Sequence, residues 1–215
     1  MTPDRRLRCL HKALRRRVGL LRMLLEAARR LGAGHSREAM LAFIVIELQA
    51  TWANFMRSYY LSCMFGAVSG RGSRIRTRFP TNNEDTAIGL AILQYRPRAH
   101  PRSHGAWRRR DEPAWHDPHT LLTLCDRFQF SNRSAIEGAL STGDRTFIDL
   151  PVFRNHFGHR DGHSQQAVQN LAPMYGLPSY LRPSHLLLTR PLKRTQTLVE
   201  DFMDAVVFAA EYMCD

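Results

Sequence analysis

A segment near residue 150 contains the residues whose types and spacing could do chemistry. It reads Leu150-Pro151-Val152-Phe153-Arg154-Asn155-His156-Phe157-Gly158-His159-Arg160. An arginine presents a planar fork of N–H donors that suits a phosphate. A histidine is the side chain most easily poised to take or give a proton near neutral pH. Arg154 and His159 therefore indicate chemistry at a phosphate group.

The spacing places a condition on this pair. His159 follows Arg154 by five positions, and residues five apart on an unbroken helix point about 140° away from each other. Both can serve one substrate only if the backbone bends between them or a second subunit supplies part of the site. Pro151 and Gly158 allow such a departure from regular helix.

The context of the pair distinguishes it from other arginine and histidine pairs in this chain. The bare spacing of four to six residues also occurs at several other places, because arginine is abundant. Only here does an apolar Leu-Pro-Val-Phe sequence lead into the arginine, with Asn155 directly after it. Phe157 and Gly158 then come immediately before His159.

In these residues the sequence resembles the HEPN superfamily, helical domains often found as RNases in bacterial toxin and antiviral systems. The signature of that family is an arginine, usually followed by Asn, Asp or His, and a histidine four to six positions later. Residues 154–159 match that signature in full. The sequence around Glu47 and Trp52-Ala53-Asn54-Phe55 is also similar to a long helix of several bacterial HEPN families. The resemblance covers roughly residues 36–214.

The resemblance implies metal-independent cleavage of RNA without a cofactor, in which the ribose 2′-hydroxyl attacks the adjacent phosphate. The products end in a 2′,3′-cyclic phosphate and a 5′-hydroxyl. Arg154 would hold the scissile phosphate and stabilise its growing charge, while His159 would move a proton. Asn155 would orient the pair or cap the helix, and His156 and Glu47 are auxiliary candidates. Because one motif has one such histidine and the reaction moves two protons, a homodimer with both motifs in one groove is implied.

Other interpretations of the same residues stay open. Arg154 could be an ordinary salt-bridge partner and His159 a hydrogen-bonded histidine at a helix end. Glu47 could be a structural carboxylate that meets an arginine. His156, His159 and His163 have the spacing of one helix face and could hold zinc, although the glycines between them disfavour a regular helix. We expect no metal.

The charge of the chain favours a polyanionic partner. The formal net charge is +12 and the pI about 10.5, so nucleic acid is expected ahead of anionic lipid. Two of the 31 basic residues are lysines, which leaves 29 arginines; a GC-rich genome would produce the same skew. The candidate RNA-contacting residues are Arg160, Arg74, Arg76, Arg108, Arg109 and Arg110. A non-catalytic module that binds RNA or a protein partner is the alternative function. An antitoxin or a sensor protein is a further candidate partner of the chain.

Cysteine usage and hydropathy predict a cytoplasmic protein without a membrane partner. The four cysteines are scattered and form no C-x-x-C pair, which argues against a disulfide framework. The most apolar run, residues 41–46, stops at Glu47, far short of a membrane span. Arginines interrupt every early leucine run, so no signal peptide is expected.

Hydrophobic periodicity of three and four residues predicts an all-α fold. The expected helices are 5–31, 37–64, 84–95, one opening at Asp117-Pro118, 134–140, 164–171 and 191–213. Residues 66–83 should form a basic loop or short ribbon, and 173–183 a loop. We expect residues 1–35 to be a basic amphipathic helical extension and 36–215 a HEPN-like helical bundle with long central helices.

Overall fold

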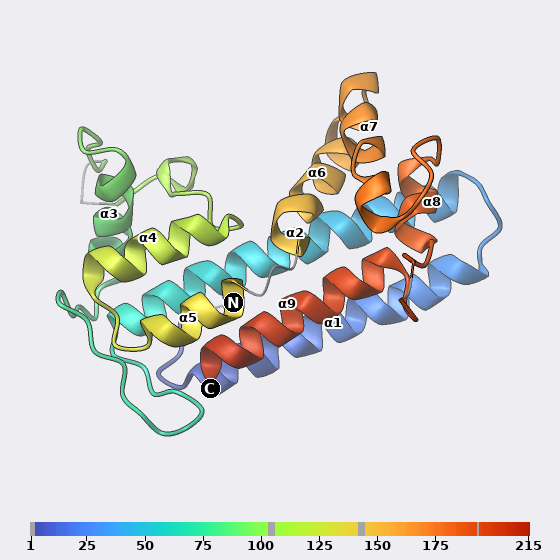
Figure 1. The fold of residues 1–215 in the computed structure, drawn as a ribbon. Helices are drawn as coiled ribbons and strands as arrows, with labels where there is room; N and C mark the ends of the chain where they lie inside the picture. Colours follow the sequence, from blue (N-terminus) through green and yellow to red (C-terminus); the bar gives the residue numbers. More distant parts are fainter. Residues whose placement is uncertain (1–2, 103–105, 142–144, 193) are drawn as a thin grey trace. The chain divides into compact units, whose positions relative to one another are not determined.

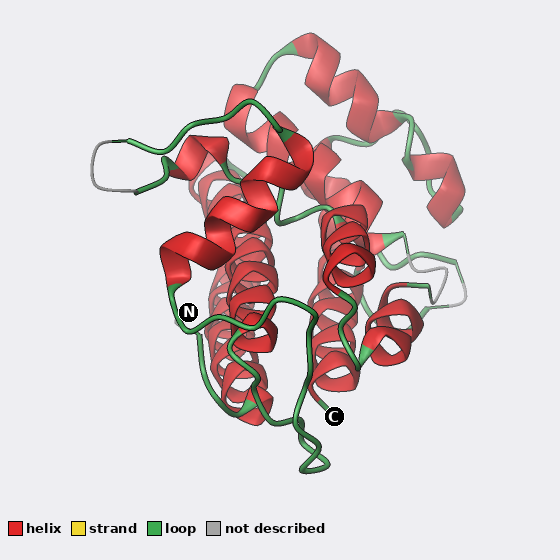
Figure 2. Ribbon diagram, turned by 90° about the vertical axis from the view of Figure 1, so that its left-hand side faces the viewer, coloured by secondary structure: helices red, strands yellow, loops and turns green. Residues whose placement is uncertain are grey.

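The computed structural model describes residues 3–102, 106–141, 145–192 and 194–215. The described residues contain helices and two isolated bridges but no strand (Figures 1 and 2). The α-helices are α1 (Leu7–Arg30), α2 (His35–Met64), α3 (Glu84–Tyr95), α4 (Pro118–Phe128), α5 (Arg133–Leu140), α6 (Thr146–His159), α7 (Gly162–Gln169), α8 (Pro183–Leu188) and α9 (Leu198–Cys214). The described residues also include two 3₁₀ turns, Arg109–Asp111 and Ala172–Tyr175. The all-α prediction is confirmed.

The chain divides into two compact units. The first unit comprises Met1–Leu14, Ala53–Gly143 and Ala209–Asp215, and the second comprises Arg15–Trp52 and Asp144–Phe208. Helices α1, α2 and α9 each contribute residues to both units. These boundaries differ from the expected division after residue 35, which stays a prediction about separable parts of the chain.

The apolar stripe predicted for the first helix is buried. Each of its members is at most 3% exposed: Leu7, Leu10, Leu14, Val18, Leu21, Leu25 and Ala28. Within the second unit, Arg22 of α1 pairs with Asp204 of α9, and Arg29 pairs with Glu200 at 2.7 Å. Helix α9 therefore lies alongside α1 in this unit (Figure 1), and the arginine-rich face of α1 supplies contacts to it.

In the first unit, the buried half of α2 is fixed by tyrosine hydroxyls. Tyr59 donates to the carbonyl of Met213 at 2.8 Å and accepts from the amide of Asn132 at 2.5 Å. Tyr60 donates to the carbonyl of Ala87 at 2.9 Å. A buried hydroxyl is stable only when it is hydrogen-bonded, so these contacts specify how α3, α5 and the end of α9 pack on α2.

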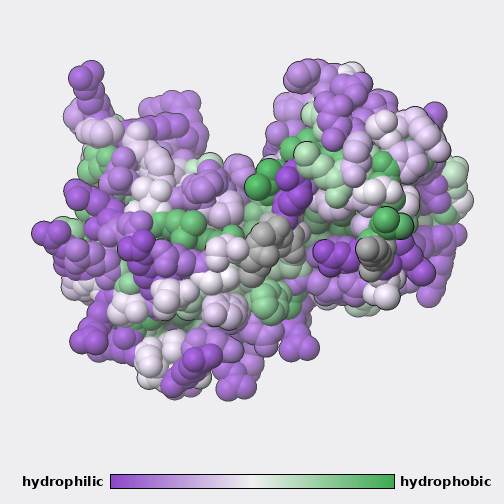
Figure 3. Space-filling model, in the orientation of Figure 1, coloured by the Kyte–Doolittle hydropathy of each residue, from purple (hydrophilic) through white to green (hydrophobic). Residues whose placement is uncertain are grey.

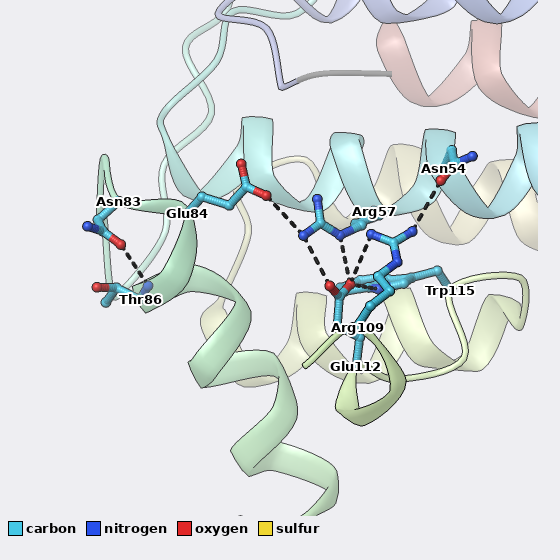
Figure 4. Close-up of polar contacts among 8 residues, drawn as sticks. All are labelled: Asn54, Arg57, Asn83, Glu84, Thr86, Arg109, Glu112 and Trp115. Atoms are coloured by element: carbon cyan, nitrogen blue, oxygen red, sulfur yellow. Dashed lines mark hydrogen bonds and ion pairs between the residues drawn. The ribbon is translucent and has the colours of Figure 1, made fainter. Parts of the chain in front are cut away.

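The first unit also contains a cluster of charged side chains around Arg57 (Figure 4). Arg57 of α2 donates two hydrogen bonds to Glu112, at 2.7 and 3.1 Å, and pairs with Glu84 at 2.9 Å. Trp115 donates to the same Glu112 carboxylate at 2.7 Å. Burial disfavours the charge on Arg57, but the hydrogen bond and charge of Glu112, with help from Glu84, outweigh burial and raise the pKa of the guanidinium. Arg57 is therefore a structural cation.

In the second unit, aromatic and charged contacts anchor α6. Trp52 stacks on Phe147 with ring centroids 4.5 Å apart, and Phe153 meets Phe202 edge-on. Asp149, fully buried, accepts two hydrogen bonds of 3.0 Å from Arg145 and one of 2.6 Å from Tyr175. These contacts fix the first half of α6 in the second unit, and the residues that follow continue the same helix.

The last part of the chain differs from the expectation. A helix was expected to start at Pro191, but α9 begins at Leu198. Glu200 supplies the glutamate half of a capping box there: its carboxylate accepts from the backbone N–H of Thr197 at 2.8 Å and from the Thr197 hydroxyl at 2.6 Å. Residues 183–188 form α8, whose first-turn proline matches the helix preference for that position.

Candidate functional site

Helix α6 carries the motif on its exposed side. Its buried face is made by residues at helical spacing, namely Phe147, Leu150, Phe153 and Phe157. The helix is continuous from Thr146 to His159, with Pro151 inside it. The backbone between Arg154 and His159 is therefore helical throughout, and the bend that would let one chain aim both side chains at one point is not present.

Arg154, Asn155 and His159 are all exposed to solvent. Nη1 of Arg154 donates to Oδ1 of Asn155 at 3.3 Å. A Cβ on Gly158 would lie 3.8 Å from the same Nη1, so the guanidinium extends along the helix toward its carboxyl end, over the glycine. Asn155 thus contacts the arginine, while the helix is capped by Arg160, whose φ of 56° is left-handed.

A cavity of about 380 Å³ adjoins the motif within the second unit. We call it the His156 cavity. Its lining comes from α2, α6, α7 and α8 and consists of Glu38, His156, Phe157, Arg160, Gln165, Arg182, Pro183 and Ser184. It brings an imidazole, two guanidinium groups and one carboxylate together in a single chain. Phosphate binding and proton transfer call for these groups.

His156 is held in this cavity by defined contacts. Nδ1 of His156 lies 3.4 Å from Oγ of Ser164, and its ring meets Phe157 edge-on at 5.2 Å. Burial lowers the pKa of His156, and the positive charge of Arg160 acts in the same direction, against the opposing charges of Asp161 and Glu38. The imidazole therefore favours its neutral form, which can accept a proton.

Glu47, an auxiliary candidate, forms an ion pair with Arg17 of α1 at 2.8 Å. It does not line the His156 cavity. The structure thus places Glu47 as the structural alternative described it, a carboxylate of α2 that meets an arginine. The contact crosses from α2 to α1 within the second unit.

The predicted RNA-contacting arginines do not form one group. Arg160 lines the His156 cavity in the second unit, whereas Arg74, Arg76 and the run 108–110 belong to the first unit. These first-unit arginines are exposed. Arg109, however, donates to Oδ1 of Asn54 at 3.1 Å and lies 3.4 Å from Glu112 (Figure 4), so it contributes to the Arg57 cluster.

A second, larger cavity in the first unit is strongly basic. Its volume is about 740 Å³, and its charged lining consists of Arg96, Arg98, Arg102, Arg108 and Asp111. His100 also lines it. Hydrophilic side chains cover much of the face drawn in Figure 3, with smaller apolar groups between them. Sequence reasoning identified Arg108 here but not the other arginines, which lie in a segment expected to be irregular.

Sequence reasoning also missed Arg182 and Glu38. Arg182 precedes α8, in a stretch expected to be a loop, and Glu38 lies in the first turn of α2. Neither has a spacing that relates it to His156. The Arg182-Pro183-Ser184 sequence was the available signal, because a proline with a preceding extended residue often opens a helix.

The three histidines considered as a zinc site do not gather. Among the described residues, no group of three His, Cys, Asp or Glu side chains is placed to hold a metal ion. The left-handed conformation of Arg160 ends the helix between His159 and His163. The three histidines therefore do not lie on one helix face, as their spacing would require.

Helix α2 is long and apolar enough to cross a membrane by length and composition. From the sequence, only the apolar run of residues 41–46 was considered as a membrane span. The core helices of soluble proteins satisfy the same criterion, and 56% of the relevant window is buried within the protein.

No protein-family model, curated protein or solved structure matches this chain. The resemblance to the HEPN superfamily therefore stays a prediction from the motif.

Proposed function

We propose that this protein is a metal-independent endoribonuclease of HEPN type that acts in the cytoplasm as a toxin or antiviral-defence effector. Its substrate is RNA, cut by attack of a ribose 2′-hydroxyl on the adjacent phosphate. The products are a 2′,3′-cyclic phosphate and a 5′-hydroxyl. The observation that carries this proposal is the accessibility of Arg154 and His159 on the last turns of an anchored helix.

The contacts of Arg154 favour a role toward a ligand. Nη1 of Arg154 donates to the neutral amide of Asn155 at 3.3 Å, and among the described residues no carboxylate pairs with Arg154. Its Nη1 lies over Gly158, which has no side chain. Arginines that serve the fold of this chain, such as Arg57 and Arg29, instead meet glutamates. An exposed guanidinium without an acidic partner is free to bind a phosphate.

The continuous helix supports a dimeric site. Since α6 is unbroken between Arg154 and His159, the two side chains of one chain diverge by about 140°. A two-fold dimer places the arginine of one copy near the histidine of the other and also supplies the second proton-transfer group. The partner in this proposal is a second copy of the chain.

The alternative is a non-catalytic module that binds RNA. The basic cavity lined by Arg96, Arg98, Arg102 and Arg108 favours it, because clustered arginines attract the RNA backbone independently of any cleavage. In the nuclease, the same arginines would add to the binding of RNA. Binding alone leaves RNA intact, so the two functions separate in one assay.

The test is incubation of the purified full-length protein with labelled single-stranded RNA in EDTA. We expect cleavage products with cyclic phosphate ends, and we expect Arg154→Ala and His159→Ala to lose at least about 100-fold in rate. Arg127→Ala and His185→Ala, which remove an exposed arginine of α4 and an exposed histidine of α8, are the matched controls and should cleave normally. Equal cleavage by all four variants, or RNA that is bound but never cut, refutes the nuclease proposal.

A further inference from the structure

We propose that His156 is a second proton-transfer residue of each chain, which takes the proton from the ribose 2′-hydroxyl while Arg160 and Arg182 bind a flanking phosphate in the His156 cavity. This inference rests on the proposed ribonuclease function and adds to it a catalytic residue and a binding subsite. His159, three positions later on the same helix, is then left to protonate the departing 5′-oxygen.

The hydrogen bonds of Ser164 fix which nitrogen of His156 is available. Ser164 donates its single hydroxyl proton to the carbonyl of Asp161 at 3.0 Å. In that arrangement its oxygen accepts at the 3.4 Å contact with Nδ1 of His156, and the matching tautomer of His156 carries the ring proton on Nδ1. Nε2 on the other edge of the ring keeps its lone pair, as a general base requires.

The surroundings of His156 keep that base neutral. The charged groups that face it are Arg160 at the end of α6, Arg182 before α8, Asp161 in the following loop and Glu38 on α2. Burial lowers the pKa of the imidazole below its ordinary 6.5, Asp161 raises it, and Arg160 lowers it further. Near neutral pH, the ring is thus unprotonated.

The charge of the cavity suits a single phosphodiester. Arg160 and Arg182 supply two fixed positive charges, against one carboxylate, Glu38, whose Oε1 accepts from Ser184 at 3.4 Å. The carboxylate repels a phosphate, but it can accept a hydrogen bond from a ribose hydroxyl or a base amino group. A volume of about 380 Å³ lies near the lower limit of roughly 300–1,000 Å³ for ligand pockets. An unstacked nucleotide of single-stranded RNA is the class of ligand that this combination favours.

The step balances without a further reactant. The 2′-O–H bond breaks and its proton passes to Nε2 of His156, while the 2′-oxygen forms a bond to phosphorus. The bond from phosphorus to the 5′-oxygen breaks, and that oxygen receives a proton from His159. The two histidines exchange protons with water before the next turnover. On a helix, residues three apart have Cβ atoms about 5–6 Å from each other, so one chain presents the base and the acid side by side.

The test uses the full-length protein and a single-stranded oligonucleotide that it cleaves at one mapped position. His156→Gln should lower kcat by roughly 10²–10⁴-fold and change KM less than about threefold, since a base acts in the transition state. In the wild-type protein, activity should fall as pH drops through the pKa of His156, and His156→Gln should remove that limb. His163→Gln, an exposed histidine on α7, is the control and should keep both the rate and the pH profile.

A second substrate separates the base from the acid. In it, sulfur replaces the bridging 5′-oxygen at the cleaved bond, so the leaving group needs no proton. His159→Ala should then recover to within about tenfold of the wild-type rate, whereas His156→Gln should stay impaired. Rescue of His156→Gln instead, or wild-type cleavage by it on both substrates, overturns the assignment while leaving the nuclease proposal in place. If the wild-type protein cleaves no RNA, the proposed function itself fails.

Discussion

Removing either partner of the ion pair between Arg145 and Asp149 should destabilise the protein, but by unequal amounts. Asp149 is fully buried, whereas the Arg145 side chain is 40% exposed. Arg145→Ala therefore leaves a buried carboxylate with Tyr175 as its remaining described partner. Loss of one partner of a buried pair costs about 3–5 kcal/mol, and we expect about 3 kcal/mol here because the pair is partly hydrated.

Asp149→Ala should cost less. It leaves a guanidinium that water can reach, and the main loss is the hydroxyl of Tyr175, which had donated at 2.6 Å. Loss of a hydrogen bond to a charged group costs about 1.5–3 kcal/mol. The double variant should be more stable than Arg145→Ala alone, because it removes the uncompensated charge.

Urea unfolding at pH 7, with equal m-values, measures these differences. The control is Arg133→Ala, which removes exposed pairs with Asp126 and Glu137 and should leave the urea midpoint nearly unchanged, because water screens exposed ion pairs. If Asp149→Ala is the more damaging single change, the burial argument is wrong.

Three further predictions concern α1, α9 and the dimer. Deletion of residues 1–31 should yield aggregated protein in size-exclusion chromatography, because buried leucines stabilise by about 2 kcal/mol each and total stability is only about 5–15 kcal/mol; a soluble, cooperatively melting product would contradict this. Burial opposes ionisation of Glu200, but hydrogen bonds from Arg29 and Thr197 lower its pKa to about 2. The stabilisation of the fold by ionised Glu200 should be complete above pH 4.5 and be lost as the pH falls toward 2. The urea midpoint of Glu200→Gln should therefore change less between pH 7 and 3 than that of the wild-type protein. Mixing inactive Arg154→Ala and His159→Ala should restore about a quarter of the activity if each of two sites combines His156 and His159 of one chain with Arg154 of the other, because half of the dimers are then mixed and each has one intact site of two; no recovery after confirmed subunit exchange would argue against a shared site.

Local signals predicted much of the fold. The leucine stripe of α1 has a helical period, and all seven of its members are buried. Asn83 caps α3 by accepting from the N–H of Thr86 at 2.9 Å, and Asp117 caps α4 with Pro118 in the first turn. Each of these depends on residues within a few positions of one another, which is the range that periodicity and capping describe.

The start of α9 shows how a local signal can be misread. Pro191 resembles a first-turn proline, but α9 begins at Leu198, directly after Thr197, which donates to the Glu200 carboxylate. That T-x-x-E pattern stands directly before an apolar run, where it marks a helix start. Hydrogen-bonding partners at the helix end thus outweighed the permissive proline.

The His156 cavity lay outside what local patterns describe. Glu38 and Arg182 meet His156 only through the packing of α2 and α8 against α6, and their separation in the sequence gives no periodic signal. The motif directed attention to Arg154 and His159, whereas the groups that one chain gathers are His156, Arg160 and Arg182. Residues on opposite sides of a continuous helix cannot converge, so tertiary contacts decide which of the motif's neighbours share a cavity.

The pair Arg154 and His159 and the cavity group His156, Arg160 and Arg182 can belong to one site. A continuous α6 sends Arg154 away from His159, but it brings His156 and His159 to neighbouring positions on the helix. If one chain supplies both histidines, the partner needs to supply only the guanidinium that neutralises the phosphate. The composite dimer then requires a single contact between α6 ends related by two-fold symmetry. Arg154→Ala and His156→Gln would therefore complement each other in mixed dimers, whereas His156→Gln and His159→Ala would not, because both histidines belong to the same half of each site.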